Sequence, residues 1–341
     1  MSRKTQYNLI TSPELMAQVN PKNVQLKNDY LDYLRSIQRS ETTVNAYSSD
    51  IDIAWVWCLQ HNDNKFFPEW TKRNIVALQG WLTNEHGNSP ARVRRVKSVL
   101  SSLSNYIESV LDDEFPNFRN IVTKVENPVN TPTREKTVLT DEMINELYDK
   151  LLESGQIEKA CALALADFSG RRKSELFRFR VCDFNEENLV CDGALFRTSE
   201  KIRTKGRGAG KFIYCYTLAN GFRPYFQKWM EYRAAHGIES EWLFPSPSDP
   251  TKPRDTGILD SWAASFSRMI DEDFYWHAMR HRMVTNLIRA GLPDSVVKEI
   301  IGWEDVSMVS VYTDMNAEER IGMFFKNGEI DTSSTKGLGD L

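Results

Sequence analysis

The sequence lacks any long apolar run. Its longest candidate, residues 160–166, falls far short of the roughly 18 apolar residues that a membrane-spanning helix needs. The first residues, Met1 to Lys4, lead into polar sequence without the apolar core of a signal peptide. These two absences argue against a membrane protein and predict a chain that stays in the cytoplasm.

Cysteines are few, and none of them are paired in a motif. The five residues are an odd number at irregular spacing, and no Cys-x-x-Cys pair occurs. This pattern is typical of reduced thiols in a reducing compartment, and it argues against a zinc site. No acidic cluster suited to another metal is evident either. We therefore expect no metal and no other cofactor.

The chain also lacks an excess of positive charge, with 43 Lys and Arg against 47 Asp and Glu. This average does not exclude nucleic acid, because DNA is bound by a local basic face. Either basic cluster of the sequence, taken alone, is most simply a solvated surface. The first contains Arg92, Arg94, Arg95 and Lys97, and the second contains Arg197, Lys201, Arg203, Lys205, Arg207 and Lys211.

What the sequence does contain is enough chain for two domains, with 341 residues of which 41% are apolar and 26% charged. Its residue pattern predicts a mainly helical protein with a small antiparallel sheet. We expect a flexible arm over 1–24, a helical domain over 25–126, a linker over 127–136, a second domain over 137–326 and a disordered tail over 327–341.

Short polar residues mark the starts of several predicted helices. Ser40, Ser89 with Pro90 after it, and Thr140 each precede apolar residues at helical spacing. Alternation over 189–195 and 211–218 predicts the strands of the antiparallel sheet, and the glycine-rich stretch between them predicts its turn.

Three separated segments hold the residues most suited to chemistry. An arginine next to an apolar helix is costly to bury without an anionic partner, and the first segment follows such a helix. The segments are Ser169 to Leu176, which contains Arg171, Arg172 and Glu175; His277 to His281, which contains Arg280; and Gly302 to Tyr312, which contains Trp303.

Each segment alone has a simpler explanation. Arg172 could merely pair with Glu175, and Tyr312 could be an ordinary core tyrosine. His277 and His281 are four residues apart and could share a helix face as metal ligands. However, the glutamate of the zinc-protease pattern is absent, and an arginine between the two histidines would repel a cation.

Together the three segments suit a phosphodiester transition state. Its charge lies on non-bridging oxygens, which planar guanidinium groups can hold bidentately. A tyrosine phenol supplies a nucleophile that can be regenerated. Because no acidic metal cage is evident, cationic side chains would take the place of a metal ion.

The segments resemble the signature of the tyrosine recombinase (phage integrase) family. That signature is an arginine in a Gly-x-Arg-x-Ser-Glu-Leu box, then His-x-x-Arg, then Gly-His or Gly-Trp, then a tyrosine nine residues on. The resemblance covers residues 25 to 326, with all three boxes in order and at family spacing. The matches are Gly170, Arg172, Ser174, Glu175 and Leu176, then His277, Arg280 and His281, then Gly302, Trp303 and Tyr312.

The resemblance implies a two-domain DNA clamp, with a helical core-binding domain and a catalytic domain. It implies a site-specific recombinase that cleaves and rejoins DNA through a covalent 3′-phosphotyrosine bond, without metal or ATP. By this resemblance Tyr312 attacks the phosphate, and Arg172 and Arg280 hold its oxygens. His277 would assist proton transfer, Lys205 would protonate the leaving oxygen, and Trp303 would buttress the phosphate. Glu175 and His281 would orient these groups.

Two details of the match are less direct. The family's catalytic lysine sits on a turn between two strands, and Lys201, Lys205 and Lys211 all compete for that role; an Arg-Thr-Lys match favours Lys205. In addition, Arg171 stands where the family usually has an apolar residue.

Double-stranded DNA with a specific target site is the partner that the resemblance implies. It also implies self-association into a tetramer on paired sites, through the helix around 317–325. We expect no membrane partner. The residues proposed for DNA contact are Arg92, Arg94, Arg95, Lys97, Arg203 and Arg207.

Other functions remain open at this point. A type IB topoisomerase would share the chemistry and relax DNA, and a telomere resolvase is a second relative, usually longer. A non-catalytic DNA-binding protein derived from a recombinase, or a plain helical scaffold, would lack turnover. A phosphotyrosine trap on nicked DNA, and DNA binding in low salt, would separate these classes.

Overall fold

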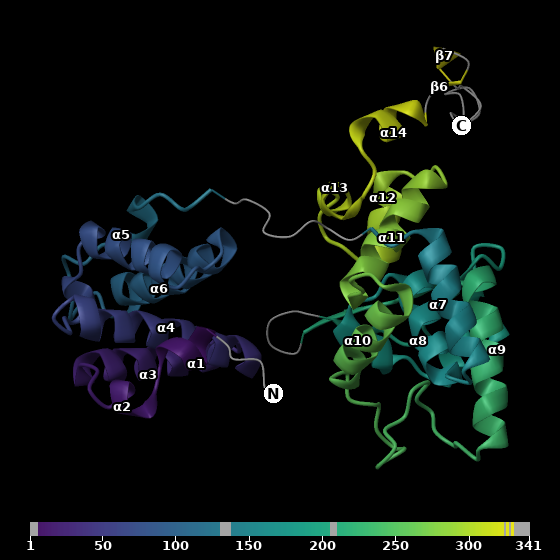
Figure 1. Ribbon diagram of the computed structural model, residues 1–341, viewed down its shortest axis with the longest axis horizontal. Coiled ribbons are helices and arrows are strands. Elements are labelled where there is room, and N and C mark those ends of the chain that lie inside the picture. Colours follow the sequence, from purple (N-terminus) through teal and green to yellow (C-terminus); the bar gives the residue numbers. More distant parts are fainter. Residues whose placement is uncertain (1–5, 130–137, 205–209, 324, 327–328, 331–341) are drawn as a thin grey trace. The chain divides into compact units, whose positions relative to one another are not determined.

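Helices make up most of both halves of the chain. The computed structural model describes residues 6–129, 138–204, 210–323, 325–326 and 329–330. These residues fall into two compact units, one before and one after the segment 130–137 (Figure 1). This agrees with the expectation of a mainly helical chain with small antiparallel sheets.

The first unit is built around one long helix, α4, which is buried on all sides over Asp50–Cys58. Ser40 begins this helix, since its hydroxyl accepts a hydrogen bond from the Thr43 amide at 3.2 Å. Ser89 caps α6 in the same way. The elements are α1 Gln6–Ile10, α2 Pro13–Met16, α3 Pro21–Ser36, α4 Glu41–His61, η1 Phe67–Glu69, α5 Lys72–Gly80, η2 Trp81–Glu85, α6 Pro90–Val110 and η3 Val122–Lys124.

The amino-terminal residues differ from the loose arm expected over 1–24. Helices α1 and α2 occupy most of residues 6–16, and Ser12 caps α2 by accepting a hydrogen bond from the Leu15 amide at 3.2 Å. Ile10 and Val19 are buried in the core of the unit. Helices of five and four residues are too short to show a helical period in a sequence, which explains the difference.

The second unit has α8 at its centre, where every residue from 160 to 166 is buried. Small alanines in this stretch let α9 and α11 pack closely against it. Its helices are α7 Asp141–Glu153, α8 Ile157–Ser169, η4 Lys173–Arg178, η5 Val181–Phe184, η6 Glu186–Asn188, α9 Ala219–Ala235, α10 Ile258–Ile270, α11 Trp276–Arg289, α12 Asp294–Ile301, α13 Met308–Tyr312 and α14 Ala317–Gly322.

The strands of the second unit form separate small antiparallel sheets. Strands β1 Leu189–Val190, β2 Leu195–Arg197 and β5 Tyr216–Leu218 make one sheet, in the order β1-β2-β5. Strands β3 Ile202–Thr204 and β4 Lys211–Ile213 form a hairpin of their own. The alternation expected over 189–195 and 211–218 thus falls on four short strands in place of two longer ones, namely β1 and the start of β2, then β4 and β5. Residues 191–194 form a turn between β1 and β2, and most of the glycine-rich stretch expected as the turn lies outside the described residues.

The carboxyl-terminal segment holds a shorter helix than expected. Helix α14 ends at Gly322, and Phe325 instead begins β6 Phe325–Lys326, which pairs with β7 Glu329–Ile330. These last two residues fall in the tail that was expected to be disordered, and backbone pairing with β6 explains the difference. The rest of that tail and most of the expected linker lie outside the described residues.

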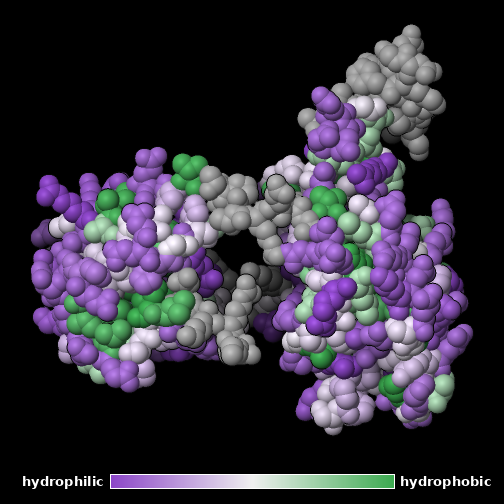
Figure 2. Space-filling model, viewed as in Figure 1, coloured by the Kyte–Doolittle hydropathy of each residue, from purple (hydrophilic) through white to green (hydrophobic). Residues whose placement is uncertain are grey.

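Hydrophobic and hydrophilic residues are mixed on the surface in view (Figure 2). On the face shown in Figure 2, hydrophobic residues form patches interspersed with hydrophilic ones on both units. Within the described ranges, no helix is long and apolar enough to cross a membrane.

Candidate active site

The first chemical segment begins where α8 ends. Gly170 ends that helix in the left-handed conformation, with φ at 58°. A Cβ atom built on this glycine would lie 2.8 Å from Ile301 Cδ1 and 3.0 Å from Met283 Cγ. Glycine therefore meets both a backbone and a packing requirement, and it lets the chain turn sharply into Arg171 and Arg172.

Arg172 is held by a buried carboxylate. Its Nη1 lies 3.1 Å from Glu175 Oε1, and its backbone amide donates to Glu175 Oε2 at 3.2 Å. Glu175 is only 1% exposed, whereas the Arg172 side chain is 32% exposed. The simple ion pair foreseen from the sequence does exist, and it leaves part of the guanidinium open to a further anion.

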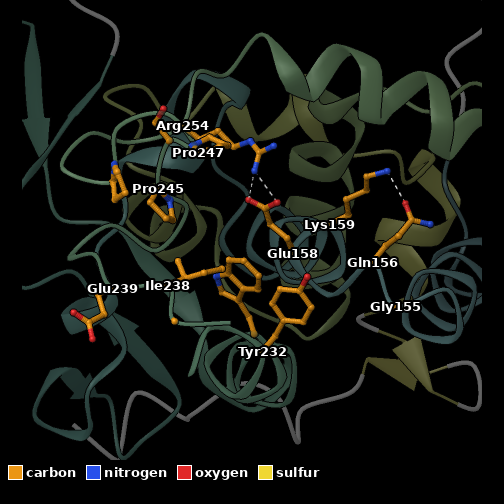
Figure 3. A pocket seen from close by; sticks show the side chains of 14 residues that line it. Gly155, Gln156, Glu158, Lys159, Tyr232, Ile238, Glu239, Pro245, Pro247 and Arg254 are labelled. Carbon is orange, nitrogen blue, oxygen red and sulfur yellow. Dashed lines mark hydrogen bonds and ion pairs between the residues drawn. The ribbon is translucent and has the colours of Figure 1, made fainter. Parts of the chain in front are cut away.

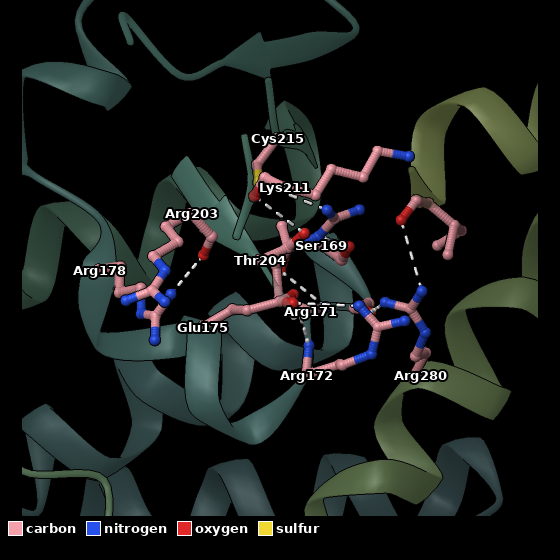
Figure 4. A network of polar contacts seen from close by, with 12 residues as sticks. Ser169, Arg171, Arg172, Glu175, Arg178, Arg203, Thr204, Lys211, Cys215 and Arg280 are labelled. Atoms are coloured by element: carbon pink, nitrogen blue, oxygen red, sulfur yellow. Dashed lines mark hydrogen bonds and ion pairs between the residues drawn. The ribbon is translucent and has the colours of Figure 1, made fainter. Parts of the chain in front are cut away.

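Arg280 on α11 is fully buried beside this pair. Its Nη1 donates to the Gly170 carbonyl at 2.7 Å and its Nη2 to the Ile301 carbonyl at 3.4 Å. Burial, and then the charges of Arg171 and Arg172, lower the pKa of Arg280 to about 9. The guanidinium groups of Arg172 and Arg280 point toward one another (Figure 4). This concentration of positive charge favours an anion at this place.

Trp303 follows the left-handed turn at Gly302, where α12 ends. Its ring lies under the Arg280 guanidinium at 5.0 Å, a cation–π contact. Among the described residues, the buried Trp303 Nε1 and the buried Arg280 Nε have no hydrogen-bond partner. Buried donors of this kind are rare, so a bound acceptor such as a phosphate oxygen fits both.

Tyr312 ends α13 inside a group of aromatic rings. The ring of His281 stacks on it at 4.6 Å, and the rings of Trp303 and His277 lie at 4.8 and 5.1 Å. His281 Nδ1 lies 3.0 Å from the Tyr312 carbonyl oxygen and 3.8 Å from the Asp314 carboxylate. The tyrosine expected as the nucleophile is thus surrounded by both histidines and the arginine of the second segment and by Trp303 of its own segment.

The candidate lysines occupy different places on the β3–β4 hairpin. Lys201 precedes β3, with its Nζ over the Tyr214 ring at 5.6 Å. Lys211 begins β4, with its Nζ 2.9 Å from Glu304. Lys205 and Arg207 lie outside the described residues, between the two strands. Arg203 is exposed on β3, and its carbonyl oxygen accepts a hydrogen bond from Arg178.

The basic cluster on α6 is less available for DNA than the sequence suggested. Lys97 is buried, and its Nζ donates to Gln79 Oε1 at 2.9 Å and to two backbone carbonyls. An ammonium group enclosed by acceptors cannot also reach a phosphate, so its assignment to DNA contact is wrong. Arg92 and Arg95 both pair with the buried Asp50, at 2.5 and 3.0 Å.

Arg94 and Arg95 are the exposed members of this cluster. Arg95 is held by Asp50, whereas the bond that Arg94 makes within the described residues is a long one, of 3.3 Å from its Nη1 to the Pro128 carbonyl. The helical period explains the contrast, since α6 buries Val93, Val96 and Lys97 on one side. The solvated surface expected for this cluster thus holds for Arg94 and not for Lys97.

Two residues of the site were not assigned a role from the sequence. Arg171 is buried next to Arg280, and its only signal was its position between Gly170 and Arg172. Asp314 stands two residues after Tyr312 and contacts His281, which no sequence pattern indicated. Only the folded structure shows that both residues lie at the site.

A separate cavity of about 540 Å³ lies at the amino-terminal end of α8 and the carboxyl-terminal end of α9. Trp229, Tyr232 and Ile238 line it, and Arg254 binds both oxygens of Glu158 at 2.5 and 2.7 Å beside them (Figure 3). None of the arginines, histidines or tyrosine of the three segments lines this cavity. It is therefore not the site built around Tyr312.

Comparisons with known proteins agree with this geometry. The model of the Phage integrase family matches residues 137–319. The SPbeta prophage-derived recombinase-like protein YomM of Bacillus subtilis (strain 168) is 26% identical over 312 residues, which cover 87% of this chain and 89% of that protein. A tyrosine recombinase of Thermosipho africanus (strain TCF52B) is 23% identical over 303 residues, covering 88% and 97% of the two chains.

Solved structures share the fold. The XerH site-specific recombinase, in a post-cleavage complex with palindromic difH substrate, has a TM-score of 0.63 at 15% identity, over 88% of this chain and 84% of that one. A lambda integrase dimer bound to a COC′ core site has a TM-score of 0.60 at 16% identity, over 95% and 86%.

Proposed function

The chain belongs to the phage integrase family of tyrosine recombinases, and we propose that it is a site-specific DNA recombinase with Tyr312 as its nucleophile. The observation that carries this proposal is the convergence of Arg172, Arg280 and Trp303 with Tyr312, with unpartnered buried donors on Arg280 and Trp303 among the described residues. Recombination through a covalent phosphotyrosine is the chemistry of this family.

In the first step the Tyr312 hydroxyl oxygen attacks a DNA phosphorus atom. A bond forms between them, and the bond from phosphorus to the 5′-oxygen breaks. A phenol holds its proton at neutral pH, so attack needs a base, and His277 is the candidate because its ring lies 5.1 Å from that of Tyr312. The product is a 3′-phosphotyrosine and a free 5′-hydroxyl.

Arg172 and Arg280 stabilise the negative charge that develops on the non-bridging oxygens. Arg280 is rigid because two carbonyls hold its Nη atoms, so it needs no rearrangement during attack. Trp303 Nε1 offers a further donor to the same oxygens. Glu175 fixes Arg172, and His281 fixes the Tyr312 backbone and ring.

Lys205 is our proposed general acid, giving its proton to the departing 5′-oxygen. The Arg-Thr-Lys match in the sequence supports this assignment. The contacts of the other two candidate lysines support it as well, since Lys201 lies over the Tyr214 ring and Lys211 pairs with Glu304. Rejoining is the reverse reaction with the 5′-hydroxyl of another strand. The phosphotyrosine bond conserves the energy of the broken bond, so neither ATP nor a metal ion is required.

We propose that the two units clamp double-stranded DNA, with phosphate contacts supplying most of the affinity. The segment around 317–325 would join copies of the chain into a tetramer on paired sites.

A likeness to Cre recombinase within the family is favoured by Trp303, by Phe67 with Pro68, and by the run Arg203 to Lys205. The substrate DNA of a bacterium, phage or plasmid lies in the cytoplasm, where the protein would act.

A phosphotyrosine trap tests the proposed function. A binding site is first selected from random DNA, and nicked duplexes of that site are then incubated with the protein in EDTA. The short fragment with the new 5′-hydroxyl diffuses away, so the covalent adduct accumulates and survives detergent. Strand exchange between two duplexes would separate a recombinase from a type IB topoisomerase, and a DNA-binding protein without catalysis would give no adduct.

A further inference from the structure

Arg171 is a buried charge to which the mechanism above gives no task. Its side chain is only 1% exposed, in the turn between Gly170 and Arg172. A buried guanidinium group is costly unless acceptors or an anion compensate it. Its surroundings therefore indicate what this residue contributes.

The contacts of Arg171 are those of a cation without a counter-ion. Its Nε and Nη2 donate to the carbonyls of Ser169 and Ile300 at 3.2 and 2.8 Å, and its Nη1 to the Cys215 thiol at 3.4 Å, a weak acceptor. In the part of the chain that the structure describes, no carboxylate pairs with Arg171 or Arg280. The neighbouring carboxylate, Glu175, is bonded to Arg172.

Arg171 also holds the turn that presents Trp303. The last carbonyls of α12 belong to Ile300 and Ile301, and Arg171 binds the first while Arg280 binds the second. Cations are favoured at the carboxyl end of a helix, where these carbonyls carry partial negative charge. The turn itself is tightly packed, since a Cβ atom on Gly302 would lie only 2.4 Å from Ile213 Cδ1, and Arg171 Nη1 lies in ordinary contact distance of it at 3.5 Å.

We propose that Arg171 is a third cation of the phosphate site and a positioning residue for its chemistry. It acts through Arg280 and the Gly302 turn, and it does not touch the phosphate. The proposal rests on the proposed function of the Tyr312 site. Figure 4 shows the three arginines side by side, with Arg171 bonded to Cys215, Arg172 to Glu175 and Arg280 to backbone carbonyls.

The physical reason is the unequal number of buried charges. The two buried guanidinium groups of Arg171 and Arg280 lie beside the half-buried one of Arg172, and the one buried carboxylate, Glu175, pairs with Arg172, so an excess of positive charge remains in a region with little water. In such surroundings charges interact over several ångströms, so Arg171 stabilises an anion without contact. The transition state carries more negative charge on the phosphate oxygens than the bound diester does. The positive charge of Arg171 therefore stabilises the transition state more than the bound diester.

The test compares two nicked duplexes of the selected site, one with a normal scissile phosphodiester and one with a neutral methylphosphonate there. Arg171→Met keeps the length of the side chain and removes the charge. We expect its single-turnover cleavage of the phosphodiester to fall roughly 10- to 100-fold, less than for a donor in direct contact. On the methylphosphonate, which lacks one negative charge, we expect the loss to shrink to about 3-fold or less.

Arg233 provides a matched control in the same unit. It is also buried, and it donates to the carbonyls of Ser240 and Trp242 at 2.7 and 2.8 Å, far along the chain from the site. Arg233→Met should lower the melting temperature and leave the cleavage rate of the folded protein unchanged. A role of Arg171 in stability alone would make the two variants alike.

Arg171→Lys completes the series, because it restores the charge and keeps the protein measurable if the methionine variant unfolds. We expect it to recover most of the phosphodiester rate. Equal losses on both duplexes, or a wild-type rate for Arg171→Met, would overturn the inference. Adduct formation by Tyr312→Phe in the same assay would instead overturn the proposed function, so the two failures are distinguishable.

Discussion

Arg280 is a buried cation whose described partners are carbonyls and aromatic rings. Its Nη atoms are engaged, its Nε is not, and the rings of Trp303 and Tyr312 lie at 5.0 and 5.6 Å from its guanidinium. If this position served packing alone, burying a methionine or leucine there would cost less free energy than burying an arginine. The arrangement is understandable when an anion completes it, which is why the phosphate assignment begins with this residue.

Removing either arginine should therefore slow cleavage more than it weakens binding. For Arg172→Ala and Arg280→Ala we expect losses of roughly 10²–10³ in single-turnover cleavage, the scale of one preorganised donor. DNA affinity should change far less, because many other phosphates are contacted. Quench-flow rates beside gel-shift affinities measure both quantities. A variant that cleaves at nearly the wild-type rate would remove that arginine from the site.

The grouping of the site residues was predictable from the sequence where a motif fixes it. The resemblance of the three segments to one family signature predicted a shared site for Arg172, Arg280, Trp303 and Tyr312, and the fold brings their side chains together. Lys97 shows the limit of this approach. Its burial depends on carbonyls of residues 125 and 126, nearly thirty positions away, which no local pattern reveals.

At the scale of elements, α6 separates two kinds of basic residue. Arg94→Gln should reduce the slope of log K against log salt by about 0.9, if Arg94 neutralises one DNA phosphate. Lys97→Met should leave this slope unchanged and lower the melting temperature, since the Lys97 ammonium group is enclosed by the protein's own oxygens. Titrations at several salt concentrations measure the slope. A flatter slope for Lys97→Met would contradict the placement seen here.

The three lysines that could serve as the general acid lie on or next to the β3–β4 hairpin. If Lys205 protonates the leaving oxygen, Lys205→Ala should stall on normal DNA and recover on a substrate with a 5′-bridging sulfur, because a thiolate leaves without a proton. Lys201→Ala and Lys211→Ala are the controls, and neither should need the sulfur. Rescue of Lys201→Ala alone would move the role to that lysine. Rescue of none would leave His277 as the next candidate.

The starts of helices were predictable from the sequence where a capping residue precedes them. Ser40, Ser89 and Thr140 each begin a helix in the structure, because their side chains accept hydrogen bonds from the first turn. The short helices α1 and α2 were not predictable, since their order comes from packing of Ile10 and Val19 on the core. The same holds for strands of two or three residues, whose pairing partners only the fold supplies.

At the scale of the whole molecule, the segment after Tyr312 should control assembly. A chain that ends at Asn316 loses α14 and the residues after it. We expect it to bind a single site and form the adduct on nicked DNA, but to fail in joining two sites and exchanging strands. Sedimentation of protein–DNA complexes and a two-duplex exchange assay measure this. Exchange at the wild-type rate would show that another surface holds the copies together.

The central claim is that Tyr312 becomes covalently joined to DNA, and its most direct test is to locate the bond. Trypsin cleaves after Lys298 and Arg320, and the peptide between them contains one tyrosine, Tyr312. After trapping on nicked DNA and nuclease digestion, mass spectrometry should find the residual nucleotide on this tyrosine, and Tyr312→Phe should form no adduct. A nucleotide on another residue, or an adduct with Tyr312→Phe, would contradict the account.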